Sequence, residues 1–80
     1  MKIHDMIETR PEVMMGKPVI KGTRIPVDLI IRKLGEGASF KDLLDAYPKL
    51  SDDAIRAALI YAADTIRNET TIYLKTGTSN

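Results

Sequence analysis

Hydrophobic side chains recur with helical spacing in three segments of the chain. In each segment they follow the pattern i, i+3, i+4, i+7, which places one apolar stripe along a helix. The three stripes are Val27, Ile30, Ile31 and Leu34; Phe40, Leu43, Leu44 and Tyr47; and Ile55, Ala58, Leu59, Ala62, Ala63 and Ile66. The pattern predicts three amphipathic helices that pack their stripes into one core.

Proline and glycine mark two of the helix boundaries. Pro26 suits the first turn of a helix, where its missing N–H leaves no hydrogen bond unmade. Gly35 or Gly37 is expected to end the first helix, because either can adopt the left-handed conformation of a C-cap. Pro48 disfavours helical geometry at the residue before it, so the second helix should end there.

Serine marks the start of the second and third helices. The Ser39 hydroxyl is placed to cap free N–H groups, and Asp42 three residues later completes a pattern like a capping box. Ser51 is placed to cap the third helix. Asp52 and Asp53 then fall in its first turn, where the helix dipole favours negative charge.

The segments on either side of the helices are predicted to be extended. Residues 1–26 have no helical period and are interrupted by prolines and glycines. Within them, 18–20 and 23–25 are expected to form a small hairpin about the turn Lys21-Gly22. Residues 2–7 are a further strand candidate. The β-branched and aromatic run 70–74 is predicted to be a short strand.

These elements define a mainly α fold class. We expect a trihelical helix-turn-helix core, homeodomain-like or winged, with a short N-terminal β arm and a short C-terminal strand. The 80 residues should form a single domain. It divides into an extended arm (1–26), the three-helix core (27–69), and a short strand with a loose tail (70–80).

Composition argues against several classes of function. The chain has no cysteine, which excludes disulfides, thiolate metal sites and cysteine nucleophiles. Its one histidine, His4, has no neighbouring pattern of zinc ligands. The phosphate-binding loop motif is also missing. We therefore expect no cofactor, no metal and no enzymatic activity. With neither a signal peptide nor a membrane-spanning run, a cytoplasmic location is expected.

The distribution of charge makes the N-terminal half the better surface for an anionic partner. Residues 1–34 carry seven basic and four acidic side chains, whereas residues 35–80 carry five basic and seven acidic ones. The segment 16–26 has three cations and no acid. It could place them against phosphates or an acidic protein site. From spacing alone, a solvated connection with exposed lysines is the favoured interpretation.

The second and third helices have the anatomy of a helix-turn-helix, but the third helix is a poor DNA reader. A recognition helix projects Arg, Lys, Asn or Gln into the major groove. This helix begins with Asp52 and Asp53, whose negative charges would be repelled by DNA phosphates. Arg56 is the only basic side chain near its start. A helix that packs and dimerises is the alternative interpretation.

The arm carries a recognisable motif. The run Gly-Lys-Pro-Val-Ile-Lys-Gly-Thr-Arg-Ile-Pro over residues 16–26 resembles the signature of the domain-of-unknown-function 433 family. The resemblance extends through Tyr-Pro-Lys-Leu-Ser at 47–51 to the alanine-rich 55–63, and covers about Ile7 to Asp64. Met15 departs from the family pattern, which commonly has a second glycine there.

The resemblance implies a non-enzymatic antitoxin. Such proteins are often regarded as antitoxins that neutralise a small PIN-like ribonuclease, form homodimers and bind their own operator DNA. A cationic group would suit the clustered carboxylates of a PIN-like active site. The candidate toxin or nucleic-acid contacts are Lys17, Lys21, Thr23 and Arg24 in the signature, and Lys49 and Arg56 at the third helix. A stand-alone DNA-binding regulator and a structural homodimer module remain alternatives.

Overall fold

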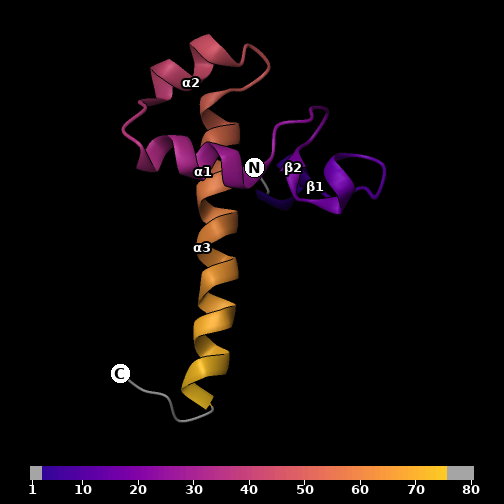
Figure 1. The fold of residues 1–80 in the computed structure, drawn as a ribbon, viewed down its shortest axis with the longest axis vertical. Helices are drawn as coiled ribbons and strands as arrows, with labels where there is room; N and C mark the ends of the chain where they lie inside the picture. Colours follow the sequence, from indigo (N-terminus) through magenta and orange to yellow (C-terminus); the bar gives the residue numbers. More distant parts are fainter. Residues whose placement is uncertain (1–2, 76–80) are drawn as a thin grey trace.

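The fold is a three-helix core with a short β arm. The computed structural model describes the backbone of residues 3–75 and the side chains of residues 5–68. The helices are α1 (Val27–Gly35), α2 (Phe40–Ala46) and α3 (Asp52–Lys75). The arm holds the 3-10 helices η1 (Ile3–Met6) and η2 (Met14–Gly16) and the strands β1 (Ile7–Glu8) and β2 (Val19–Ile20). Figure 1 shows α1, α2 and the arm gathered around the first half of α3. The predicted mainly α class with an N-terminal β arm is confirmed.

The predicted serine caps are present. The Ser39 hydroxyl accepts the Asp42 N–H at 3.0 Å, and the Asp42 carboxylate accepts the Ser39 N–H at 2.9 Å. The Ser39 backbone N–H, and after it the Ser39 hydroxyl, stabilise the charged Asp42 carboxylate and hold the pKa of Asp42 below its usual value. The Ser51 hydroxyl accepts the Ala54 N–H at 3.1 Å. Both helices therefore begin where the sequence predicts.

Glycine and proline also act as expected. Gly37 has φ +107°, donates to the Leu34 carbonyl, and is followed by an Ala38 N–H that donates to the Lys33 carbonyl. This arrangement is a Schellman motif, which satisfies the last carbonyls of α1. Pro26 is the N-cap of α1, one position before its first turn. α2 ends at Ala46, two residues before Pro48.

The core is made by the first half of α3 together with α1, α2 and the arm. Its buried cluster combines one or more residues from each: Ile20, Val27, Ile30, Leu43, Leu50, Ala54, Ile55 and Ala58. Ile30 and Ile55 are fully buried. Ala54 and Ala58 are also buried, and their small side chains let neighbouring elements lie close to the α3 backbone. The predicted stripes are therefore the core, except that the α3 stripe is buried only as far as Ala58.

The arm is extended, but its strands are shorter than predicted. Ile20 donates its N–H to the Ile25 carbonyl, so the segments 18–20 and 23–25 do turn back on each other. β2 also pairs antiparallel with β1, with Ile7 opposite Ile20. The predicted strand at 2–7 is wrong for Ile3–Met6, which form η1; Lys2 lies outside the described residues. The 3-10 turn leaves the Met6 carbonyl free to accept the Lys21 N–H at 2.9 Å.

The predicted C-terminal strand at 70–74 is wrong. α3 continues without a break to Lys75. Extending an existing helix adds one hydrogen bond for each residue fixed, whereas a lone strand leaves its backbone groups unpaired. The β propensity of the run is a weak preference that context overrides. The predicted loose tail, 76–80, lies outside the described residues. No helix in the described part of the chain is both long and apolar enough to cross a bilayer.

We expect Ile30→Ala to destabilise the fold by about 2–5 kcal/mol, because it leaves a cavity in the buried cluster. The matched control is Ile60→Ala on α3, whose parent side chain is 44% exposed and should cost under about 1 kcal/mol. Urea unfolding of both variants with an unchanged slope would measure the difference. Equal losses would contradict the core described above.

A second prediction concerns the left-handed turn in η2. Met14, Met15 and Gly16 all have positive φ, of 49°, 57° and 84°. A side chain costs roughly 1–2 kcal/mol in this conformation, and glycine loses about 0.5–1 kcal/mol in chain entropy. Met15 is 94% exposed, so it contributes little packing. Met15→Gly should therefore raise the unfolding free energy by roughly 0.5–1 kcal/mol. Met15→Ala, which keeps the Cβ, should leave it unchanged.

Candidate functional site

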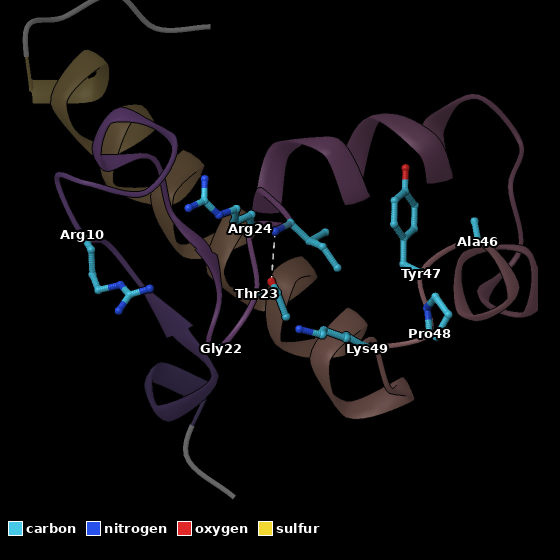
Figure 2. A pocket seen from close by; sticks show the side chains of 9 residues that line it. Arg10, Gly22, Thr23, Arg24, Ala46, Tyr47, Pro48 and Lys49 are labelled. Atoms are coloured by element: carbon cyan, nitrogen blue, oxygen red, sulfur yellow. Dashed lines mark hydrogen bonds between the residues drawn. The ribbon is translucent and has the colours of Figure 1, made fainter.

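A basic hollow lies between the arm and the connection from α2 to α3. It has a volume of about 540 Å³ and is lined by Arg10 and residues 22–25 on one side and residues 46–49 on the other. Arg10, Arg24 and Lys49 are its charged lining residues, and no acidic side chain lines it. Figure 2 shows Lys49 extending toward Thr23, with Arg10 on the far side of Gly22. The hollow thus combines three cations from three separate segments.

Short hydrogen bonds fix the arm side of the hollow. Gly22 has φ +78°, a backbone conformation that would be strained for a residue with a side chain. Glycine therefore allows the tight turn after β2. The Thr23 hydroxyl donates to the Ile20 carbonyl at 2.7 Å and accepts the Ile25 N–H at 3.0 Å. Figure 2 draws the second of these bonds as a dashed line that ends at Thr23. Thr23 therefore closes the turn that presents Arg24.

Glu8 connects β1 to this turn and to Arg10. Its Oε2 accepts the Gly22 N–H at 3.0 Å and lies 3.8 Å from the Arg10 Nε. Glu12 lies at the same distance from Arg10 on its other side. Ion pairs this long between exposed groups are weak. A guanidinium carries five N–H donors, so Arg10 keeps donors available for a ligand.

The helix side is fixed by a buried leucine. Leu50 is in the core, and its N–H donates to the Tyr47 carbonyl at 2.9 Å. This bond closes the turn between α2 and α3. Lys49 precedes the anchored Leu50 and is exposed. The same turn that joins the two helices therefore presents a cation to the hollow.

The structure brings together three of the six predicted contact residues. Thr23, Arg24 and Lys49 line the hollow, whereas Lys17, Lys21 and Arg56 do not. Lys21 is exposed on the turn beside it.

The other two residues lie elsewhere. The Lys17 ammonium is 3.7 Å from the Asp28 carboxylate, at a groove between α1 and α3. The Arg56 guanidinium lies 5.8 Å from the centre of the Phe40 ring, a cation–π distance that ties α3 to α2.

Sequence reasoning missed Arg10. It stands between Glu8 and Glu12 in the sequence, so its charge is locally balanced. Arg10 follows β1, and Gly22 follows β2. Arg10 therefore reaches the hollow only because β1 pairs with β2, which brings it beside the turn at Gly22. The excess of positive charge in residues 1–34 includes Arg10 and was the available signal.

The described residues offer no metal site. They contain no group of three or more His, Cys, Asp or Glu side chains that could hold an ion. The His4 side chain lies outside the described residues. Asp42 is engaged in the cap of α2, and Asp52 and Asp53 lie in the first turn of α3. The geometry of the hollow favours binding of an anionic group.

Comparison with known proteins identifies the family. The family described as "Protein of unknown function (DUF433)" matches residues 7–62. The chain belongs to the DUF433 family. A crystal structure of a DUF433 member protein from Anabaena variabilis ATCC 29413 is similar, with a TM-score of 0.75 and 32% identity. The similarity covers 82% of this chain and 65% of that chain. The resemblance noted in the sequence is confirmed.

Two further relatives of this DUF433 chain carry no functional name. The uncharacterized protein y4eO from Sinorhizobium fredii is 33% identical over 70 residues, which cover 86% of this chain and 32% of that protein. An uncharacterized protein from Archaeoglobus fulgidus is 76% identical over 21 residues, or 26% of this chain and 58% of that protein. The chain thus spans about a third of the first relative and under two thirds of the second.

Glu8→Ala should loosen the turn that presents Arg24. The Gly22 amide would lose its acceptor, so its hydrogen exchange measured by NMR should speed up several-fold. Glu12→Ala is the matched control, since Glu12 contacts Arg10 without bonding Gly22 in the same way. Equal Gly22 exchange rates in the two variants would show that Glu8 does not hold the turn.

Proposed function

We propose that this DUF433 protein is an antitoxin-like binding protein of the cytoplasm. It neutralises a PIN-like ribonuclease by covering its active site and performs no chemistry of its own. The observation that carries the proposal is the hollow that Arg10, Arg24 and Lys49 line and that no acidic side chain lines. The partner ribonuclease is the one that members of this family are expected to bind.

Electrostatics make such a pairing favourable. A PIN-like active site holds metal with clustered carboxylates, so its rim is acidic. Arginine binds carboxylates through paired N–H donors, and lysine adds a compact positive charge. Complementary charge also accelerates the encounter of the two proteins. The rigid turns on both sides of the hollow reduce the entropy lost on binding.

A stand-alone DNA-binding regulator is the second candidate. The observation that favours it is the order α2, short turn, α3, which is the connectivity of a helix-turn-helix. The acidic first turn of α3 weakens the idea, because Asp52 and Asp53 would meet phosphates. The hollow could still bind one backbone phosphate. A homodimeric assembly module is a third candidate, and a homodimer is also compatible with the first two.

The test is capture of the partner from the native host. Full-length tagged protein should co-purify a small ribonuclease, identified by mass spectrometry. The triple variant Arg10→Ala, Arg24→Ala, Lys49→Ala should lose it, with at least a tenfold weaker affinity in calorimetry, or about 1.4 kcal/mol. The control Arg32→Ala, Lys33→Ala, Lys41→Ala removes the same charge outside the hollow and should bind normally.

Two observations distinguish the antitoxin from the DNA-binding regulator: which molecule co-purifies, and how steeply binding weakens as salt rises. Co-purification of specific DNA without a nuclease, with binding that falls steeply as salt rises, would favour the regulator. Wild-type affinity of the triple variant for a captured ribonuclease would remove the hollow from the interface.

A further inference from the structure

The second half of α3 projects beyond the core. A helix of 24 residues is about 36 Å long. No described side chain after Ala58 is buried, and Ile66 is 61% exposed. Figure 1 shows this part of α3 extending away from α1, α2 and the arm. The radius of gyration, 14.1 Å, also exceeds the roughly 12 Å of a compact chain of this length. The described apolar side chains of this part stay in water, so a partner surface that buried them would stabilise it.

A groove runs along the base of this projection, between α1 and α3. Its volume is about 780 Å³, and its apolar lining includes Val27, Ile31, Tyr61 and Ile66. It shares no lining residue with the basic hollow.

The charges at the rim of the groove balance one another. Lys17 lies 3.7 Å from Asp28, and Arg32 lies 3.9 Å from Glu36. The rim therefore has two positive and two negative charges. A neutral apolar groove does not suit a nucleic acid or the acidic rim of a nuclease. It suits an uncharged stripe on another helix.

The projecting helix carries such a stripe in its own sequence. Leu59, Ile66 and Tyr73 are spaced by seven residues, the repeat of paired helices. Ala62 and Ala63 lie between the first two, and small residues let a second helix approach closely. The groove and the stripe that fits it thus belong to one chain, which is the condition for a self-complementary contact.

From these features we infer that a second copy of this chain occupies the groove. The two α3 helices lie antiparallel about a two-fold axis near Ile66, so that Leu59 of one copy faces the C-terminal half of α3 in the other. The paired segment, 59–75, is about 25 Å long and 10 Å wide. Each copy adds the α1 wall of its groove. The strip alone is about 250 Å² in projection, so these walls supply the rest of the roughly 600 Å² a side at which stable interfaces begin. The inference specifies the homodimer named above and does not depend on the ribonuclease.

The absence of cysteine makes a direct test possible. Ile66→Cys puts one thiol on each copy next to the two-fold axis. Mild oxidation of the full chain at micromolar concentration should convert most of it to a covalent dimer. Asp53→Cys, exposed in the first turn of α3, is the control and should give only a trace.

Sedimentation provides the second measurement. Wild-type protein should sediment as a dimer, and Ile66→Glu should raise the dimer dissociation constant at least tenfold. Ile60→Glu makes the same change at an exposed isoleucine that does not line the groove, and should remain dimeric. Circular dichroism would verify that both variants fold.

The outcomes separate this inference from the proposed function. A monomeric wild type at 100 μM, or equal cross-linking of the two cysteine variants, overturns the inference even if a ribonuclease is captured. A dimer that Ile66→Glu dissociates and Ile60→Glu preserves supports it even if no ribonuclease is found.

Discussion

The packing of α1 against the first half of α3 is the contact on which the other features depend. It buries Ile30 and Ile55 completely, and the small side chains of Ala54 and Ala58 keep the elements close. Because Val27 at the start of α1 is in the same core, the arm that leads into α1 is held there too. The Val27 N–H donates to the Pro18 carbonyl, which continues the contact from the helix into the arm. The arm also packs directly on α3 through η1 and β1, so its position relative to α2 and α3 follows from these contacts together.

Both surface depressions are consequences of that arrangement. The arm turns back after β2 and brings residues 22–25 beside the connection between α2 and α3, which creates the basic hollow. Full burial on α3 also ends at Ala58, with Tyr61 packed at the edge of the core, while the helix continues for four to five more turns. The groove at Tyr61 and Ile66 opens where the contact with α1 ends. No acid lines the first depression, whereas positive and negative charges balance at the rim of the second, so the two are suited to partners of different chemistry.

The sequence predicted well those features whose cause lies within one or two turns of chain. Ser39 and Asp42 are three residues apart, and their reciprocal cap depends on little else. The helical stripes are similarly local. Arg10 was missed because its approach to Gly22 depends on the pairing of β1 with β2, twelve residues away. The end of α3 was predicted wrongly. Residues 70–74 have a local preference for β structure, but they continue a helix that its packed first half has already formed, and this context overrides the preference.

The placement of the acidic side chains explains how a nearly neutral protein can present a cationic site. The net charge is only +1, with eleven acidic residues. On the helix side of the hollow, the nearby acids are held at helix starts or in pairs within one helix: Asp42 caps α2, and Asp45 accepts a hydrogen bond from Lys41 at 2.9 Å. On the arm side, Glu8 is used to hold the Gly22 amide. The carboxylates thus serve the fold at positions that do not line the hollow. Of the three cations, Arg10 is partly balanced by Glu8 and Glu12 at 3.8 Å, and no acid lines the hollow itself.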